Sequence, residues 1–210
     1  MSSMVITGAS GGLGRVVVTH MRSVGWTVYP LDRADGDLAS ESDVQRMFTK
    51  IPPDVSALVH LAGGIVAGKP LEEISLEELH TMFATNLVST FNVMRNVLPL
   101  FKAHSGGSIV TIGAQAFHHP VPSRAAYAAA KSGVVSLTQS VAEEGRLHNI
   151  RANCILPSII RTAANLEWAQ GDEAEAWVTP EQIAETIAHL CSPACAINGA
   201  VIPIYGKGAF

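Results

Sequence analysis

The sequence predicts an α/β fold, a doubly wound parallel sheet with helices on both faces. Two observations predict it: short, almost wholly apolar runs typical of buried parallel strands, and segments of helical period between most of these runs. A sheet built in this way binds ligands in a crevice beyond the carboxyl ends of its strands. The strands are expected at residues 4–7, 27–31, 56–61, 108–112, 151–156 and 200–204.

The strongest helix signals are two capping boxes. Ser75 is followed three residues later by Glu78, and Thr179 is followed by Pro180 and Gln182 in the first and third helical positions. In each pattern, side chains accept hydrogen bonds from backbone N–H groups that the first turn of a helix leaves unpaired. Helices are therefore expected to begin after Ser75 and after Thr179.

Two segments depart from the regular alternation of strands and helices. Only four residues separate Asp32 from Asp37, which leaves no room for a helical crossover, so a third strand at this point is expected to be short or degenerate. Residues 163–178 are polar and acidic, with Gly171 and Asp172 at their centre. They are expected to form a small flexible cover over the crevice.

Length and composition favour one compact domain, residues 1–210, and exclude several functions. The chain has 48% hydrophobic and 15% charged residues, and its net charge of -4 argues against a nucleic-acid partner. It shows neither a signal-peptide pattern nor an apolar run of the roughly 20 residues that a membrane span needs. A cytoplasmic protein without a membrane partner is expected.

The cysteines predict neither a disulfide framework nor a metal site. There are three, an odd number, and Cys154 falls in an expected buried strand. His189, Cys191 and Cys195 lack a fourth ligand and match no usual zinc spacing, so no metal is expected. Buried or incidental thiols are the better interpretation.

A glycine-rich turn, TGASGGLG at residues 7–14, joins the first expected strand to a segment of helical period. Gly8, Gly12 and Gly14 carry no side chain that would keep a phosphate away from the backbone amides opening that helix. Those amides and the helix dipole favour negative charge. The order of the expected elements indicates a Rossmann-like dinucleotide cradle: a strand, the glycine turn, a helix, a second strand and the acid Asp32.

Tyr127 and Lys131 lie four residues apart in a helix-forming stretch, so both side chains project from one helix face. A free tyrosine has a pKa of about 10, and a neighbouring cation favours the phenolate and lowers that pKa. The pair is suited to donate a proton to a carbonyl oxygen or to take one from an alcohol. Taken alone, a Tyr and a Lys at this spacing are also typical of an ordinary surface pair.

Several motifs in the same order resemble the short-chain dehydrogenase/reductase family over almost the whole chain. The TGxxxGxG form of the turn is similar to that of the short, single-domain members, which disfavours epimerase chemistry. The motifs are Thr7-Gly8 with Gly12 and Gly14, Asn86, Tyr127 with Lys131, and NCILPSIIRT at residues 153–162.

The resemblance implies a catalytic role for three side chains, Tyr127, Lys131 and Asn86. Tyr127 would exchange the proton with a small-molecule substrate. Lys131 would hold the nicotinamide ribose and lower the pKa of the phenol. Asn86 would hold a backbone kink and a water that extends the proton relay.

A nicotinamide cofactor would lie along the carboxyl ends of the strands. A carboxylate at Asp32 accepts from ribose hydroxyls and repels a 2'-phosphate, whereas Arg33 beside it would attract one. NADP-preferring members of the family often have a basic residue in place of Gly11, so NAD (NADH) is expected and NADP is less favoured. The expected cofactor contacts are Gly8, Ser10, Gly11, Gly12, Leu13, Gly14, Asp32, Arg33, Asp37, Leu38, Ala62, Gly63, Tyr127, Lys131, Pro157 and Thr162.

Two positions have a structural interpretation beside the functional one. Asp37 and Leu38 resemble the family's adenine-contacting pair, but a solvated turn acid explains Asp37 nearly as well. HLAG at residues 60–63 stands where the family has Asn-Asn-Ala-Gly and keeps the small residues that let the cofactor pass. His60 is expected to be a buried structural residue.

One departure from the family concerns the substrate side. Most active members have a serine thirteen residues before the tyrosine; here that position is Ala114, whose methyl group cannot donate to an alkoxide. The dihydropteridine reductase branch, which this chain partly resembles, also has Gly-Ala there, so activity is compatible with the absence of serine. Gln115, His118 or His119 is expected to supply the missing polar contact.

Two functions follow from these observations. The leading one is an oxidoreductase that transfers a hydride between NAD(H) and a carbonyl, imine or quinonoid carbon. The alternative is a regulatory or structural protein that binds NAD(H) and whose catalytic site has decayed at Ala114. Related proteins assemble through two long helices, here near residues 76–102 and 123–147, so a homodimer or homotetramer is expected.

Overall fold

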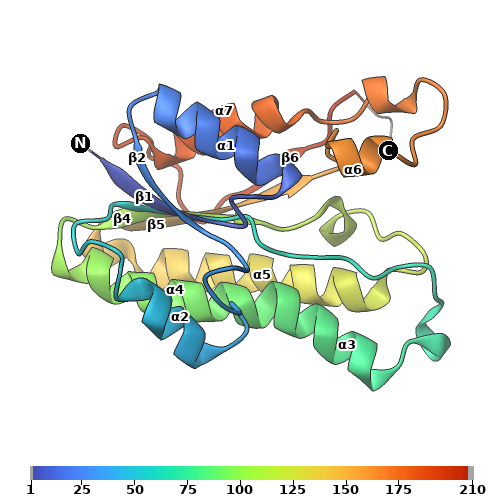
Figure 1. Cartoon of the computed structure of the whole chain (residues 1–210), viewed down its shortest axis with the longest axis horizontal. Coiled ribbons are helices and arrows are strands. Elements are labelled where there is room, and N and C mark those ends of the chain that lie inside the picture. The colour runs from blue at the N-terminus through green and yellow to red at the C-terminus, as the bar shows by residue number, and fades with distance from the viewer. Residues whose placement is uncertain (1, 208–210) are drawn as a thin grey trace.

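A computed structural model of the chain describes residues 2–207, so the two ends of the predicted domain, residue 1 and residues 208–210, lie outside the description. Within the described part, six parallel strands form one sheet in the order β2-β1-β3-β4-β5-β6 (Figure 1). The predicted fold class is confirmed, and all six expected strands are present. They are β1 (Ser3–Thr7), β2 (Thr27–Leu31), β3 (Ala57–His60), β4 (Gly107–Ile112), β5 (Ile150–Pro157) and β6 (Val201–Ile204).

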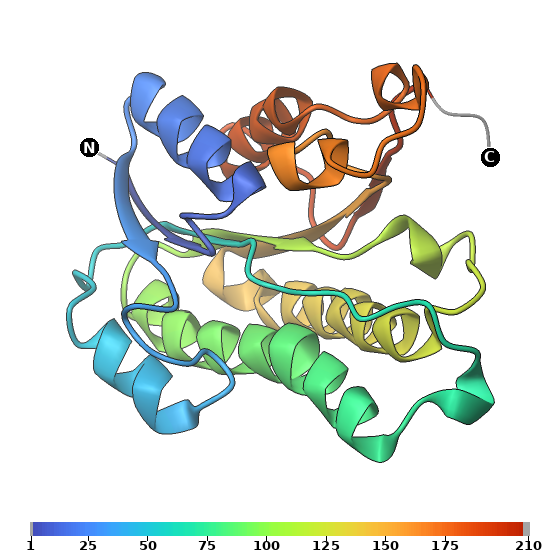
Figure 2. The same ribbon diagram turned by 45° about the vertical axis from the view of Figure 1, so that its right-hand side comes forward.

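Two layers of helices enclose the sheet (Figures 1 and 2). The upper layer in Figure 1 contains α1 (Gly12–Ser23), α6 (Ala163–Leu166) and α7 (Pro180–Cys191). The lower layer contains α2 (Glu41–Phe48), α3 (Leu76–Phe83), α4 (Ser89–Ala103) and α5 (Ala125–Glu144). The remaining helical turns are η1 (Leu71–Glu73), η2 (Ala84–Val88), η3 (Gln115–Phe117), η4 (Arg146–His148) and η5 (Glu173–Glu175).

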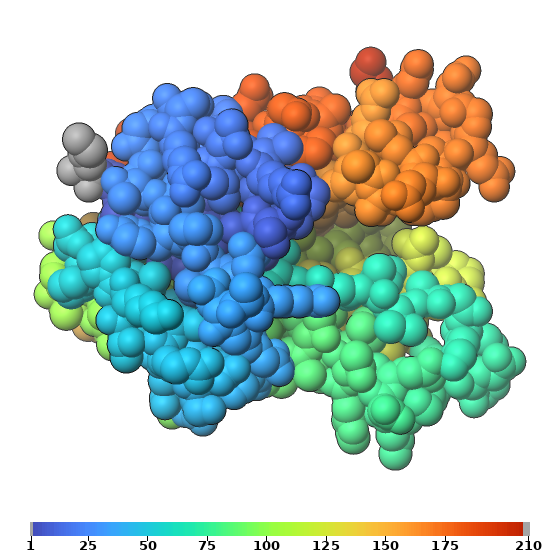
Figure 3. Space-filling view, viewed as in Figure 1, coloured from blue at the N-terminus to red at the C-terminus, as the bar shows by residue number. Residues whose placement is uncertain are grey.

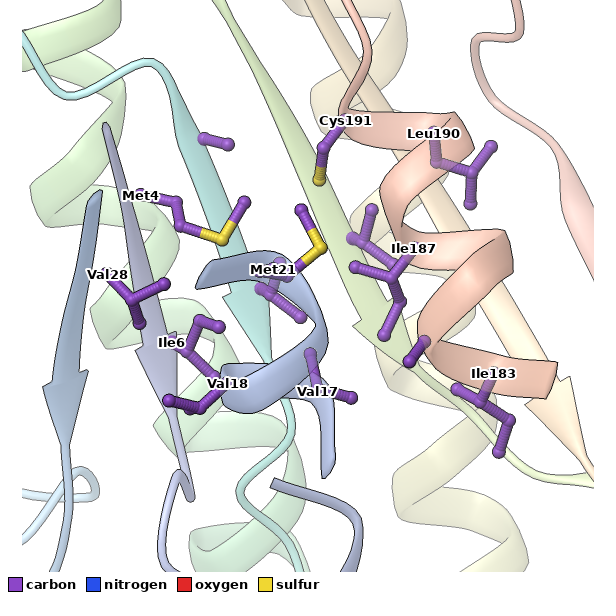
Figure 4. Packing of buried hydrophobic residues seen from close by; sticks show 14 of the residues in the cluster. Met4, Ile6, Val17, Val18, Met21, Val28, Ile183, Ile187, Leu190 and Cys191 are labelled. Atoms are coloured by element: carbon purple, nitrogen blue, oxygen red, sulfur yellow. The ribbon is translucent and has the colours of Figure 1, made fainter. Parts of the chain in front are cut away.

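Alternate residues of β1 face the two helical layers. Met4 and Ile6 belong to a buried cluster with Val17 of α1 and Ile187 of α7 (Figure 4). Val5 belongs to a second buried cluster, which includes residues of α2 and α4. Because successive side chains of a strand point to opposite faces, a strand covered on both sides has to be apolar throughout. This explains the continuous apolar run at the start of the sequence.

The strand order reverses at β1. β2 pairs with one side of β1 and β3 with the other, so that Thr7 has Leu31 and His60 as its neighbours across the sheet. The connections that leave β1 and β3 at their carboxyl ends therefore diverge, and a crevice opens between them. The crevice lies where the sequence predicted it.

Both predicted capping boxes are confirmed. The side chain of Ser75 accepts from the backbone N–H of Glu78, and that of Thr179 accepts from the backbone N–H of Gln182. In return, the Glu78 and Gln182 side chains accept from the backbone N–H groups of the capping residues, at 2.9 and 3.0 Å. α3 and α7 consequently begin where the sequence predicted.

The third strand expected after Asp32, short or degenerate, is absent from the described residues. Within residues 2–207, no strand lies between Leu31 and Ala57, and α2 leads directly from β2 to β3. β2 is therefore an edge strand, and it contains Pro30, which has no N–H group to offer a further strand. The short connection has room for one helix but not for a helix and a strand.

The predicted cover, residues 163–178, contains α6 and η5, and its end is joined by backbone contacts to the residues just before its start. Ile160 forms a parallel bridge with Val178, and the N–H of Arg161 donates to the Val178 oxygen at 2.8 Å. The rings of Trp168 and Trp177 lie with their centroids 5.0 Å apart. The segment thus has packing of its own, and its flexibility stays a prediction.

Three further findings concern partners and thiols. No helix in residues 2–207 is both long and apolar enough to cross a membrane. The same residues contain no group of three or more His, Cys, Asp or Glu side chains placed to hold a metal ion. Cys154, Cys191 and Cys195 are buried free thiols, as the sequence predicted.

Candidate active site

The glycine-rich turn packs so closely that side chains would not fit. Gly8 has a φ of +67°, and a Cβ there would lie 2.9 Å from the backbone N of Ala62. A Cβ on Gly14 would overlap the Gly8 oxygen. Because α1 begins at Gly12, the unpaired N–H groups of its first turn lie directly beside the glycine-rich turn.

A cleft of about 820 Å³ opens at the carboxyl ends of β1, β2 and β3. This volume is within the usual range of cofactor pockets. Figure 3 shows the face of the molecule hollowed between the orange segment around α6 and the green α3. Nine predicted cofactor residues line the cleft: Gly8, Ser10, Gly11, Asp32, Arg33, Asp37, Leu38, Ala62 and Gly63.

Asp32 is fixed against the glycine-rich turn. Its Oδ1 accepts hydrogen bonds from the backbone N–H and from the hydroxyl of Ser10, both at 2.9 Å. Its Oδ2 accepts no hydrogen bond from residues 2–207, so it is available to hydroxyl groups of a ligand. The carboxylate is therefore held in a defined orientation in the cleft wall.

Asp37 and Leu38 both line the cleft and belong to a hydrogen-bonded turn. The Asp37 carboxylate accepts from the N–H of Ala39 at 2.9 Å, which fits the interpretation of Asp37 as a turn acid. The Leu38 oxygen accepts from the side-chain amide of Asn92 on α4 at 3.1 Å. Asp37 can therefore stabilise the turn while the turn also forms part of the cleft wall.

Asn86 lies in a π-helical turn, η2, between α3 and α4. The sequence implied a backbone kink here, and a π turn is such a local widening of the helix. The side chain is buried; its Nδ2 donates to the oxygens of Gly64 and Met82, and its Oδ1 accepts from the N–H of Gly64 at 3.2 Å. Asn86 thus links the helix to the loop that follows β3.

Lys131 and Tyr127 lie in the first half of α5, with Lys131 Nζ 6.0 Å from the centre of the Tyr127 ring. Nζ donates a hydrogen bond of 2.8 Å to the Ile112 oxygen at the end of β4. Lys131 is only 6% exposed, and burial lowers its pKa to about 8.

The phenol of Tyr127 does not have the lowered pKa that the sequence suggested. Burial raises its pKa, and the nearby positive charge of Arg124 only partly opposes this effect. The expectation failed because helical spacing places a cation nearby but does not show how much water the phenol loses.

Asn86 and Lys131 meet at Gly63. A Cβ on Gly63 would lie 2.8 Å from Asn86 Oδ1 and 3.1 Å from Lys131 Nζ. Gly63 also forms part of the cleft wall. An amide and an ammonium group therefore lie directly behind Gly63 of the cleft wall, and Tyr127 lies one helical turn before Lys131.

Ala114 is buried two residues after the end of β4, and the loop beyond it carries the other three predicted substrate-side residues. His118 Nδ1 lies 3.0 Å from the hydroxyl of Tyr205, and the His119 ring packs edge-on against the Tyr205 ring. Gln115 is half-buried at the start of η3. The two histidines thus contact the end of the chain after β6, whereas Gln115 stays next to Ala114.

The other predicted cofactor residues are not part of the cleft lining. A Cβ on Gly12 would lie 3.0 Å from the Thr162 Cβ, so the start of α6 covers the glycine-rich turn. Leu13 packs against the core beneath α1, and Pro157 ends β5. The residues outside the lining are Gly12, Leu13, Gly14, Tyr127, Lys131, Pro157 and Thr162.

Several residues in the cleft wall were not predicted as site residues. Thr85 and Ser89 are the most informative, because they flank Asn86 in and just after η2. Residues three apart on a helix share a face, so the spacing from Asn86 was a usable signal for Ser89. The unpredicted lining residues are Gly36, Ala39, Leu61, Ala84, Thr85 and Ser89.

His60 is 2% exposed at the end of β3, so the prediction of a buried residue is confirmed. Burial, and to a smaller extent the positive charge of Lys131, lower its pKa to about 3. The imidazole is therefore neutral at physiological pH.

The parallel sheet, the glycine-rich turn and the adjacent cleft define the class of dinucleotide-binding α/β proteins. Residues 21–206 match the family model described as enoyl-(acyl carrier protein) reductase. The chain is also 26% identical over 242 residues to short-chain dehydrogenase/reductase olcF of Penicillium canescens, with 96% of this chain and 94% of that protein covered. The chain belongs to the short-chain dehydrogenase/reductase family, a family of oxidoreductases.

Solved structures share the fold. A 3-ketoacyl-(acyl-carrier-protein) reductase from Brucella melitensis, complexed with NADH, has a TM-score of 0.89 at 23% identity over 98% of this chain and 97% of that one. The protein ElxO with NADP bound has a TM-score of 0.90 at 22% identity, with the same two coverages of 98% and 97%. The architecture described above is thus that of known proteins with NADH or NADP bound.

Proposed function

We propose that the protein is an NAD(H)-dependent oxidoreductase that transfers a hydride between nicotinamide and a small carbonyl or alcohol, or an imine or quinonoid compound. One observation carries the proposal: Asn86 and Lys131 meet at Gly63 in the cleft wall, with Lys131 Nζ 6.0 Å from the centre of the Tyr127 ring. The whole chain, residues 1–210, would form one dinucleotide-binding domain. The nicotinamide, when bound, supplies or accepts the hydride.

The residues of the cleft fit a dinucleotide. Gly8, Gly11 and Gly63 line the cleft without a side chain that would obstruct a ligand, and the first turn of α1 offers unpaired N–H groups to a pyrophosphate. Structures with this fold contain NADH in one case and NADP in another, which supports a nicotinamide cofactor here.

Asp32 supports NAD over NADP. Two hydrogen bonds from Ser10 hold its carboxylate in the cleft wall, where it would repel a 2'-phosphate and accept from the ribose hydroxyls. Arg33 also lines the cleft and would attract a phosphate. Because a fixed charge acts more strongly than one on a long side chain that must first be ordered, we favour NAD.

Tyr127 is the proposed proton donor and acceptor. Because burial raises the pKa of the phenol, Tyr127 is protonated at neutral pH and can donate to a substrate oxygen during reduction. Lys131, whose pKa is about 8, is mostly an ammonium at pH 7 and would stabilise the phenolate that this donation leaves. In this proposal Lys131 also holds the ribose hydroxyls.

The substrate oxygen needs a hydrogen-bond donor that Ala114 cannot supply. Gln115 is the best placed of the three candidates, since His118 and His119 contact Tyr205. The side-chain amide of Gln115 has two N–H donors, and the residue is half-buried next to Ala114. We therefore assign Gln115 to the role of the missing serine.

The second candidate function is a regulatory or structural protein that binds NAD(H) without turning it over. Ala114 is the observation in its favour. The buried and fully hydrogen-bonded Asn86 argues against it, because cofactor binding alone does not require an amide held in a π-helical turn.

Two measurements on the unaltered protein test the proposal. Fluorescence titration with NADH and NADPH is expected to give the lower Kd for NADH. Oxidation of NADH, followed by its absorbance, is then expected with at least one member of a panel of small aldehydes, ketones, imines and quinones. Tight NADH binding with no turnover of any compound would favour the regulatory function, and binding of neither nucleotide would refute both.

A further inference from the structure

His60 is buried behind the wall of the cleft, and its two ring nitrogens connect the two sides of the site. Nδ1 lies 2.8 Å from Thr7 Oγ1, at the start of the glycine-rich turn. Nε2 lies 3.5 Å from Ser89 Oγ, just after the π-helical turn. Ser89 lines the cleft and His60 does not, so His60 acts on the cleft through its neighbours.

The Ser89 hydroxyl sets the direction of both hydrogen bonds. Ser89 Oγ gives its proton to the Thr85 oxygen at 2.7 Å, so it accepts from His60 Nε2. A neutral imidazole carries one proton, so Nδ1 is the acceptor and takes the hydroxyl proton of Thr7. The chain of hydrogen bonds runs from Thr7 in β1 through His60 in β3 to Ser89 and the Thr85 oxygen in η2.

The hydroxyl of Ser89 forms a hydrogen bond within the π-helical turn. The N–H of Ser89 donates to the oxygen of Ala84, five residues back, and is therefore lost to the oxygen of Thr85, four residues back. Ser89 Oγ supplies a bond to the Thr85 oxygen, and Thr90 Oγ1 supplies one to the Asn86 oxygen. The two hydroxyls thus stabilise the widened turn that contains Asn86.

We propose that His60 is a positioning residue that couples the glycine-rich turn, through Thr7, to the π-helical turn of Asn86, through Ser89. This inference rests on the proposed function, because that function places both the glycine-rich turn and the π-helical turn of Asn86 at the cofactor site. An asparagine, which the family has at this place, would reach Thr7 from the position of Nδ1 but would be too short to reach Ser89. The link to the π-helical turn is therefore a property of the histidine in this chain.

Amide side chains at position 60 test the two links separately. His60→Asn keeps a polar atom near the position of Nδ1, and His60→Gln keeps one near the position of Nε2. His60→Phe keeps the volume of the ring without either hydrogen bond and is the matched control for packing. Two readouts are needed: the Kd for NADH by fluorescence titration, and hydrogen exchange of the backbone amides of residues 85–90 by NMR or mass spectrometry.

The expected results differ between the variants. His60→Gln raises the Kd for NADH about fivefold and leaves exchange at residues 85–90 within twofold of the unaltered protein, because only the Thr7 link is lost. His60→Asn does the reverse: exchange accelerates about fivefold and the Kd stays within twofold. His60→Phe shows both changes. If His60→Asn and His60→Gln change both readouts equally, in proportion to their loss of thermal stability, His60 is only a packing residue and the inference is wrong.

A second pair of variants covers the case in which a His60 variant does not fold. Thr7→Val and Ser89→Ala each remove one link and leave His60 in place, and they are expected to reproduce the changes of His60→Gln and His60→Asn, respectively. Exchange is measured without cofactor, so it decides the inference even if the unaltered protein binds neither NADH nor NADPH. That last result would refute the proposed function alone.

Discussion

Lys131 donates a hydrogen bond of 2.8 Å from Nζ to the backbone oxygen of Ile112, the last residue of β4. The bond fixes the ammonium group at the end of β4, beside Gly63. It also keeps a positive charge in a place where burial disfavours one, since Lys131 is 6% exposed. A buried charge of this kind has consequences for both stability and activity.

Lys131→Met is expected to stabilise the protein at neutral pH. The pKa of Lys131 is lowered from 10.5 to about 8 in the folded chain, so between these pH values the unfolded chain binds more protons and the contribution of this group to stability rises with pH. Below pH 8 the buried ammonium costs stability, by about 1–3 kcal/mol. Urea unfolding at pH 7 and pH 10 is expected to show a gain for Lys131→Met that shrinks at the higher pH.

Lys50→Met, which removes an exposed lysine, is the control for this prediction and is expected to leave stability within about 0.5 kcal/mol at both pH values. A loss of stability in Lys131→Met at pH 7 would contradict the account. It would mean that the hydrogen bond to Ile112 outweighs the cost of burying the charge.

Asp32→Ala is expected to reduce the preference for NADH. Without the carboxylate, the ribose hydroxyls lose an acceptor and a 2'-phosphate is no longer repelled, so the ratio of the Kd for NADPH to that for NADH falls about tenfold. Fluorescence titration with both nucleotides measures this ratio. Asp54→Ala removes an exposed acid that is not in the cleft wall, and an equal effect from that control would show that only net charge matters.

Gly63→Ala is expected to disturb the place where Asn86 and Lys131 meet. The added methyl group would lie 2.8 Å from Asn86 Oδ1 and 3.1 Å from Lys131 Nζ, so both polar groups would have to move. We expect turnover to fall at least about tenfold. Gly64→Ala is the matched control, because its methyl group would meet only Thr85 Cγ2, at 3.3 Å. Equal losses in both variants would show that the effect is one of loop geometry.

The surface of α4 is expected to mediate assembly into a dimer or tetramer. Phe91 on α4 is 47% exposed and Val88, just before it, is 39% exposed, which leaves apolar surface on one of the two long helices. Small-angle scattering of the unaltered protein is expected to give two or four times the chain mass of 22.1 kDa. Phe91→Glu is expected to shift that mass toward the monomer. A monomeric mass for the unaltered protein would refute the prediction.

The fold could be predicted in most of its parts because the signals are local. A buried strand can be predicted from the residues of its own apolar run. The start of α3 can be predicted from Ser75 and Glu78, which lie within one helical turn of each other. Among the predicted residues that line the cleft, Gly8, Ser10, Gly11 and Asp32 followed from the order of the elements, since parallel strands end at the same edge. Asp37, Leu38, Ala62 and Gly63 followed from the resemblance to the family.

The features that the sequence did not show depend on distant contacts. His118 pairs with Tyr205, which lies 87 positions later in the chain. The raised pKa of Tyr127 reflects how much of its surroundings is apolar, which helical spacing does not encode. In the part of the chain that the structure describes, no strand forms between Leu31 and Ala57, and β1 pairs with β2 and β3 instead. This pairing joins segments that are far apart in the sequence.

The most direct test of the account is the rate of NADH oxidation by Tyr127→Phe, measured at saturating NADH with any substrate that the unaltered protein reduces. The phenyl ring keeps the packing and loses the proton, so the account predicts a fall in kcat of at least about 100-fold with the Kd for NADH unchanged within twofold. A variant that retains the activity of the unaltered protein would contradict the assignment of Tyr127 as the proton donor.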